Sequence, residues 1–214
     1  MAYLYLERDG KVYTVSRNGR LDLPREGDPI PFTYRILHRL PWGDEGVMFG
    51  VPELARHPHE WVGKDEIPER EDVSPALREA VHRSLPRAVA EGIVEKGGRI
   101  LLVRASRGLT EGLWSLPGGF LTFGESPELA VKREVEEELG TPCRVGRLLG
   151  VRSKVGEHTG LHWLMFFYEV QLAGEPKPDP DEIEEARFFP KKEAADRLCD
   201  KTMAAFLRTL IQPS

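Results

Sequence analysis

The stretch GGFLTFGESPELAVKREVEEELG, from Gly118 to Gly140, is the segment that most strongly determines the expected fold. Ser126-Pro127 predicts the start of a helix, because serine is a favoured N-cap and proline suits the first helical position. Gly140 predicts the helix end, since glycine readily adopts the left-handed conformation that follows a last turn. An apolar stripe on this helix is expected to be buried. The stripe consists of Val131, Val135 and Leu139.

Three glutamates on this predicted helix share one face. Glu134, Glu137 and Glu138 stand at i, i+3 and i+4, within an arc of about 100°. Like charges at this spacing destabilise a helix by ~0.2–0.5 kcal/mol per pair. A hard divalent cation such as Mg²⁺ turns the repulsion into binding, because carboxylate oxygens are its preferred ligands. The alternative is a solvated acidic face on a surface helix, which is where Glu136 is expected to point.

The residues around the helix favour the metal site over the acidic surface. Gly118 and Gly119 precede the helix, and glycines let the backbone approach a ligand closely. A backbone carbonyl in this turn can also face a cation. A glycine turn followed by an acidic helix therefore predicts a site for a cation and an anionic ligand.

This stretch resembles the signature of the Nudix hydrolase family, G-x5-E-x7-R-E-U-x-E-E-x-G-U, in which U is a bulky aliphatic residue. Thr141 departs from the pattern at the last position, which serves packing. The flanking segments Leu101 to Gly119 and Asp181 to Pro190 also resemble family segments, so that the likeness covers about residues 88–211. The matching signature residues are Gly119, Glu125, Arg133, Glu134, Val135, Glu137, Glu138 and Gly140.

The resemblance implies a role for each of these polar residues. Glu134, Glu137 and Glu138 are expected to bind Mg²⁺, with Mn²⁺ able to substitute, and the carbonyl of Gly118 is expected to be a further ligand. Glu182 is expected to complete the metal cluster, and its alternative role is a surface charge. Either Glu134 or Glu182 is expected to be the catalytic base. The remaining signature residues, Gly119, Glu125 and Arg133, are expected to hold the loop against the helix.

Two residues near the glycine turn are candidates for substrate contact. Arg104 is a fork-shaped donor that suits a phosphate, and its alternative role is a surface salt bridge. Phe120 can stack on a base, and its alternative role is packing.

The order of expected elements predicts an α+β protein. Over residues 87–214, strands mix with helices without regular alternation, which favours a mixed sheet covered on both faces. The resemblance implies the Nudix α/β/α sandwich for this part. Residues 1–72 predict a small, mainly β N-terminal domain, in which Asp9-Gly10 joins two strands as a hairpin. Residues 73–86 predict a helical linker that begins at Ser74-Pro75.

Composition sets the broad class of protein. The 214 residues carry a net charge of −5, which argues against nucleic acid or a membrane as the main partner. Neither a membrane-length apolar run nor a signal-peptide layout is visible, so a cytoplasmic location is expected. The two cysteines, Cys143 and Cys199, are too few for a disulfide framework. A small-molecule nucleotide is the expected ligand, and a homodimer is the expected assembly.

The expected reaction is metal-dependent hydrolysis of a phosphoanhydride bond by attack of water at phosphorus. A nucleoside diphosphate linked to another moiety, such as ADP-ribose or a nucleotide sugar, is the favoured substrate. One alternative is a house-cleaning nucleoside triphosphate pyrophosphohydrolase. The other is a non-catalytic regulator that senses a nucleotide metabolite, although regulators often lack some of the glutamates that are complete here.

Overall fold

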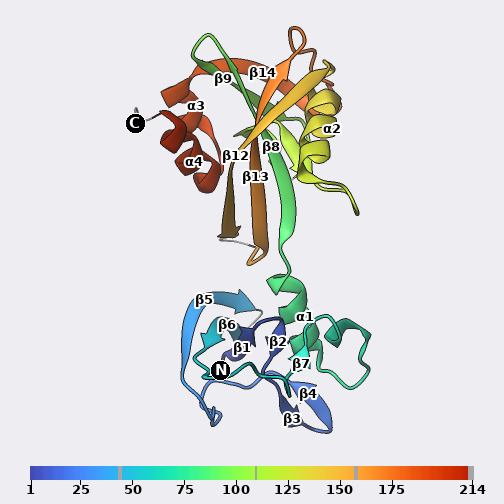
Figure 1. The fold of residues 1–214 in the computed structure, drawn as a ribbon, viewed down its shortest axis with the longest axis vertical. Coiled ribbons are helices and arrows are strands. Elements are labelled where there is room, and N and C mark those ends of the chain that lie inside the picture. Colours follow the sequence, from blue (N-terminus) through green and yellow to red (C-terminus); the bar gives the residue numbers. More distant parts are fainter. Residues whose placement is uncertain (43–44, 109, 157–158, 212–214) are drawn as a thin grey trace. The chain divides into compact units, whose positions relative to one another are not determined.

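A computed structural model describes residues 1–42, 45–108, 110–156 and 159–211 (Figure 1). The chain divides into two compact units. The first comprises Met1–Leu85 and Gly156–His162, and the second comprises Pro86–Val155 and Trp163–Ser214. All residues predicted for the site belong to the second unit.

The second unit is built on a seven-stranded mixed sheet. The main path of the sheet runs β10-β9-β8-β13-β12, while β11 pairs with β8 and β14 pairs with β9. β8 is parallel to β13 and antiparallel to β9 and β11, which confirms the expected mixed sheet. The strands are β8 (Arg87–Lys96), β9 (Arg99–Ala105), β10 (Trp114–Ser115), β11 (Gly118–Phe120), β12 (Cys143–Val155), β13 (His162–Leu172) and β14 (Ile183–Pro190).

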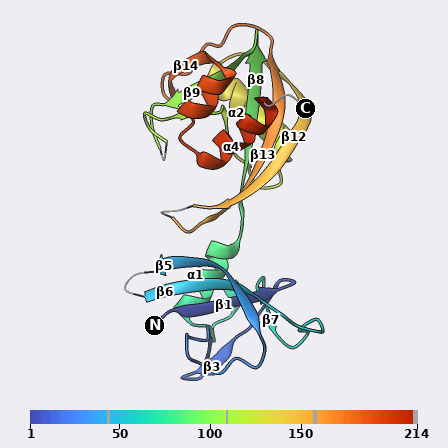
Figure 2. The ribbon, with the colours of Figure 1, turned by 90° about the vertical axis from the view of Figure 1, so that its left-hand side faces the viewer.

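Helices cover both faces of this sheet (Figures 1 and 2). On one face lies α2 (Pro127–Leu139), whose stripe of Val131, Val135 and Leu139 is fully buried in a core that includes Ala90 and Val94 of β8. On the other face lie α3 (Lys191–Arg197) and α4 (Lys201–Ile211). Phe206 of α4 stacks on Phe167 of β13 there, with ring centroids 4.2 Å apart. This arrangement confirms the expected α/β/α sandwich.

The ends of α2 follow from local sequence. The hydroxyl oxygen of Ser126 accepts a hydrogen bond from the Leu129 amide at 3.4 Å, as expected of an N-cap. Gly140 has φ = 56°, and a Cβ at this position would lie 2.4 Å from the carbonyl oxygen of Lys177. That carbonyl has little freedom to move, because the Lys177 amide donates to Leu139 O at 2.7 Å. Only glycine therefore fits where α2 ends.

The Gly140→Ala substitution is expected to destabilise the protein more than Gly97→Ala does. Both glycines have nearly equal positive φ, 56° and 57°, but a Cβ at Gly97 would have no atom within 4 Å. Alanine at positive φ costs about 1–3 kcal/mol, and only Gly140→Ala adds a clash with backbone. Urea unfolding of both variants measures the difference. Equal losses would mean that the Lys177 contact does not constrain this turn.

The first unit contains a five-stranded sheet in the order β5-β6-β1-β2-β7. The turn between β1 and β2 has positive φ at both Asp9 and Gly10, 51° and 71°, which confirms the predicted hairpin. β6 is parallel to β1 and was not predicted from the sequence. A separate pair, β3 (Val15–Arg17) and β4 (Arg20–Asp22), completes the strands described here. The five strands of the sheet are β1 (Tyr3–Arg8), β2 (Lys11–Val12), β5 (Tyr34–Trp42), β6 (Glu45–Pro52) and β7 (Val62–Gly63).

The helix predicted over residues 73–86 is present as α1 (Pro75–Ser84), but it is not a linker. Its N-cap is Ser74, whose hydroxyl accepts from the Leu77 amide at 3.0 Å. Leu77, Ala80 and Val81 are buried in the core of the first unit, together with Tyr5. The apolar face of α1 therefore makes the helix part of this unit. The charged residues that precede α1 in the sequence had suggested a linker instead. A one-turn 3₁₀ helix, η1 (Ile67–Glu69), precedes it.

The described residues also bear on membrane spanning and on disulfide bonding. None of the helices in these ranges combines the length and the apolar character needed to cross a membrane. Cys143 and Cys199 are both free thiols. Burial raises the pKa of the Cys143 thiol to about 11, so this thiol stays protonated at neutral pH.

Candidate functional site

Two glycines of β11 bring the backbone close to the acidic face of α2. Gly118 has φ = 147°, and a Cβ here would approach the carbonyl oxygen of Ala90 to 2.2 Å. A Cβ on Gly119 would lie 2.6 Å from the carboxyl carbon of Glu134. The Gly118 amide donates a hydrogen bond to Glu138 Oε2 at 3.0 Å. The missing side chain at Gly119 thus makes room for Glu134, while the Gly118 amide holds Glu138.

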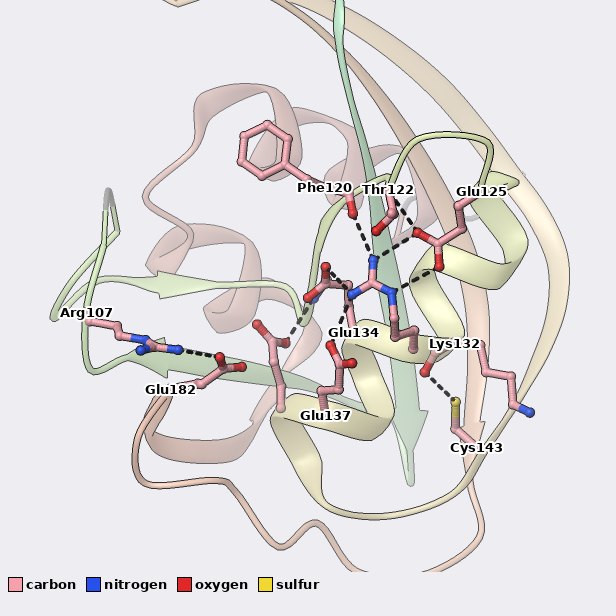
Figure 3. A network of polar contacts seen from close by, with 12 residues as sticks. Arg107, Phe120, Thr122, Glu125, Lys132, Glu134, Glu137, Cys143 and Glu182 are labelled. Atoms are coloured by element: carbon pink, nitrogen blue, oxygen red, sulfur yellow. Dashed lines mark hydrogen bonds and ion pairs between the residues drawn. The ribbon is translucent and has the colours of Figure 1, made fainter.

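Arg133 anchors the loop that leads into α2 (Figure 3). Its guanidinium forms a bidentate contact with Glu125, with Nε–Oε1 and Nη2–Oε2 distances of 3.0 and 2.9 Å. Nη2 also donates to the carbonyl oxygen of Phe120 at 3.0 Å. These three bonds tie the loop to the helix, which is the role that the family resemblance implies for Glu125 and Arg133.

The same guanidinium also reaches two predicted metal ligands. Nη1 of Arg133 lies 2.8 Å from Glu134 Oε1 and 3.0 Å from Glu137 Oε2. Glu134 and Glu137 therefore have a resident positive partner, whereas Glu138 accepts its hydrogen bond from the Gly118 amide.

Arg133 lowers the pKa of the Glu125 carboxyl from its ordinary value of 4.5 to about 2. Because the pKa is lower in the folded state, this contact stabilises the fold fully above about pH 4.5, and its contribution is lost as the pH falls toward 2. We expect the unfolding free energy of the wild type to fall more steeply below about pH 5 than that of Glu125→Gln. Urea titrations at several pH values measure the two slopes. Parallel slopes would show that the pair does not form in solution.

The other predicted carboxylates lie near one another. The Glu134 side chain is only 18% exposed, and burial raises its pKa. Burial raises the pKa of Glu138 well above its usual value, with the Gly118 hydrogen bond acting in the opposite sense. Glu182 precedes β14, and its charge adds to the rise at both Glu134 and Glu138. The fold therefore brings these three carboxylates together, while Glu137 is 53% exposed on the outer side.

The donor set fits a hard divalent cation. Its side-chain ligands are all carboxylate oxygens, which Mg²⁺ prefers, and burial raises the pKa of two of them, Glu134 and Glu138. Among the residues that the structure describes, no three acidic, histidine or cysteine side chains are already gathered as a cage. Arg133 holds Glu134 and Glu137, and Arg107 holds Glu182 at 2.5 Å. A cation bound there would compete with these arginines for the carboxylates.

The two candidates for substrate contact flank the site. Arg104 lies 3.0 Å from Glu184 and 2.9 Å from Glu185, so its guanidinium is held in ion pairs. Phe120 is 51% exposed, and its ring points away from the carboxylates (Figure 3). Its ring centroid lies 5.5 Å from that of Trp163, which offers an aromatic surface beside the glycine turn.

Sequence reasoning missed one acidic residue of this region, Glu91 of β8. It is 5% exposed, and burial raises its pKa to about 8, opposed by the charge of Lys154. Lys154 is in turn ion-paired with Asp200. The sequence signal for it is a single charged residue inside the apolar run from Val89 to Val94. Glutamate is rarely fully buried unless it is paired, and buried acids are frequent at functional sites.

The expectation for Glu136 needs correction. Its side chain does not simply point to solvent, because Glu136 Oε1 accepts a hydrogen bond from the Cys143 amide at 2.9 Å. The residue thus links the end of α2 to the start of β12. This contact depends on an acceptor oxygen rather than on charge, so an amide can replace the carboxylate.

The chain belongs to the Nudix family, because the model of the NUDIX domain matches residues 85–210, more than half of its length. An ADP-ribose pyrophosphatase from Methanocaldococcus jannaschii is 36% identical over 104 residues, which are 49% of this chain and 62% of that protein. An NAD-capped RNA hydrolase, NudC, from Pseudomonas aeruginosa is 34% identical over 97 residues, which are 45% of this chain and 34% of that protein. The match therefore spans less than two thirds of the length of either relative.

Solved structures agree with this assignment. A Nudix hydrolase from Nitrosomonas europaea superposes with a TM-score of 0.52 at 25% sequence identity, over 59% of this chain and 89% of that one. Residues 1–84 lie outside the matched family segment.

Proposed function

We propose that this protein hydrolyses a phosphoanhydride bond in a nucleoside diphosphate linked to a second moiety, with Mg²⁺ as the cofactor. The observation that carries the proposal is the group of carboxylates Glu134, Glu138 and Glu182 beside the glycines of β11. A diphosphate is polyanionic, so it enters such an acidic site only together with cations. A bound Mg²⁺ supplies the charge neutralisation and Lewis acidity that this reaction needs.

The chain's own residues have distinct tasks in this proposal. Glu134, Glu137, Glu138 and Glu182, with the carbonyl of Gly118, would hold the cation. Either Glu134 or Glu182 takes the proton from the attacking water as oxygen bonds to phosphorus and the bridging P–O bond breaks. The products are a nucleoside monophosphate and the phosphorylated second moiety. Arg133 keeps the acidic helix and its loop in register through Glu125 and Phe120 O.

The favoured substrate class rests on the relatives. One is named ADP-ribose pyrophosphatase and another NAD-capped RNA hydrolase. ADP-ribose and NAD each contain a diphosphate that joins a nucleoside to a second group. The exposed Phe120 ring beside Trp163 suits a flat base or a similar planar group next to the diphosphate.

A substrate panel tests this assignment. Purified protein with Mg²⁺ is incubated with ADP-ribose, nucleotide sugars, NADH, dinucleoside polyphosphates, CoA and nucleoside triphosphates, and the products are separated by chromatography. We expect the highest kcat/KM on ADP-ribose or a nucleotide sugar, with a nucleoside monophosphate as product. Preferred release of pyrophosphate from triphosphates would support the house-cleaning alternative. Binding without turnover would support the regulatory one.

The homodimer expected from the sequence remains a prediction. Sedimentation equilibrium of the full chain measures its mass in solution, and a mass of twice 24.2 kDa is the expected result. A single-chain mass at working concentrations would contradict it.

A further inference from the structure

Glu91 lies on β8, the strand that pairs with β11 in the sheet. It stands opposite Gly118 in the antiparallel pair of β8 and β11. A Cβ on Gly118 would lie 3.0 Å from Glu91 Oε2, so the carboxylate occupies space that glycine leaves free. Any larger residue at position 118 would collide with backbone atoms of Ala90 and Glu91. The side chain of Glu91 thereby reaches the residue whose carbonyl is the proposed metal ligand.

Gly118 joins two carboxylates. Its amide donates to Glu138 Oε2 at 3.0 Å. Glu91 Oε2 lies 3.0 Å from the position that a Cβ on Gly118 would occupy. The charges of Glu91, Glu138 and Glu134 are close enough to repel one another. Glu91 is therefore in the same electrostatic neighbourhood as the acidic face of α2, although it comes from a different element.

The cations nearby are already engaged. Burial of the Glu91 carboxylate outweighs the attraction of Lys154, so its pKa is raised. Lys154, whose charge acts on Glu91, forms its ion pair with Asp200. Arg133 is shared among three carboxylates, and Arg107 serves Glu182. A divalent cation bound between Glu91 and Glu138 would favour the ionised form of both carboxylates, which burial disfavours.

We propose that Glu91 is a further metal-binding carboxylate, and that Glu91 and Glu138 together hold a divalent cation beside Gly118. The inference rests on the proposed function, because it extends the set of metal-binding glutamates to a residue of β8. The competing role for Glu91 is a purely structural charge that balances Lys154.

Manganese binding to the full-length protein separates these roles. Calorimetric titration with Mn²⁺, without substrate, gives the affinity and the number of ions for wild type and for Glu91→Gln. We expect Glu91→Gln to weaken Mn²⁺ binding by roughly tenfold or more, since the loss of a group that only orients a ligand already costs about that much. The melting temperature without metal should rise or stay unchanged, because a buried charge is removed, and the rise on adding Mn²⁺ should shrink. A structural partner of Lys154 would instead lower the metal-free melting temperature and leave Mn²⁺ binding unchanged.

Two further variants complete the test. Glu95→Gln is the matched control on β8, where Glu95 is 47% exposed and pairs with Lys191, and it should bind Mn²⁺ like the wild type. Glu138→Gln tests the underlying site. If Glu138→Gln weakens Mn²⁺ binding and Glu91→Gln does not, the role of Glu91 is refuted and the proposed function stands. If neither weakens it, the proposed metal site itself is wrong. Should Glu91→Gln not fold, Glu91→Asp takes its place, and wild-type Mn²⁺ affinity in that shortened side chain would overturn the proposal.

Discussion

Substitution of Glu138 by glutamine is expected to lower kcat/KM by about a hundredfold or more, while the protein stays folded. Glutamine removes the negative charge at nearly constant volume, and its amide oxygen can still accept from the Gly118 amide. The fold is expected to tolerate the change well, because burial disfavours the ionised carboxylate at this position. Steady-state kinetics on the preferred substrate and a thermal melt of the same preparation measure both effects.

The matched control on the same helix is Glu136→Gln. Its amide oxygen still accepts from the Cys143 amide, so both the link to β12 and the activity should be nearly unchanged. If Glu138→Gln kept more than about a tenth of the wild-type kcat/KM, the lost transition-state stabilisation would be below ~1.4 kcal/mol. That is too little for a metal ligand and would remove Glu138 from the site.

Removal of divalent cations is expected to abolish turnover, and added Mg²⁺ or Mn²⁺ is expected to restore it. Glu134, Glu138 and Glu182 repel a diphosphate as they stand, and the nearby arginines are engaged by carboxylates. Without a cation, no positive group described at the site is free to neutralise the substrate. Activity assays after exhaustive chelation, followed by titration with each metal, measure the effect.

The metal-free protein should nevertheless remain folded, since its cores are apolar and Arg133 partly neutralises the acidic helix. Circular dichroism of the chelated sample is therefore the control that separates loss of cofactor from loss of fold. Addition of Mn²⁺ should raise the melting temperature with concentration, because a ligand that binds only the native state stabilises it. Turnover undiminished after chelation would refute the proposed mechanism.

The elements that could be predicted from sequence are those defined by short-range rules. The start and end of α2 depend on Ser126, Pro127 and Gly140, all of which act on adjacent backbone. The hairpin of β1 and β2 depends in the same way on Asp9-Gly10. The grouping of Glu134 and Glu138 also follows from the geometry of a single helix.

The elements that sequence reasoning missed depend on contacts between distant segments. β6 pairs in parallel with β1. The two strands are some forty residues apart, so no local turn signal in the sequence indicates their pairing. The burial of α1 likewise depends on a sheet formed elsewhere in the first unit, so its own residues predict a helix but not its place in a core. Glu91 could not be assigned to the site from sequence, because only the pairing of β8 with β11 places it opposite Gly118.

The five contacts of Arg133 have a consequence for how the protein acquires its cation. Three of them, to Glu125 and the Phe120 carbonyl, are independent of the metal site and keep the guanidinium in place. The other two engage one oxygen each of Glu134 and Glu137, so Arg133 would compete with a bound cation for these carboxylates. Binding of a cation would therefore weaken these two contacts, and the measured affinity would be the difference between the two attractions. Such a site is expected to hold its cation loosely when alone and firmly once a diphosphate contributes ligands of its own.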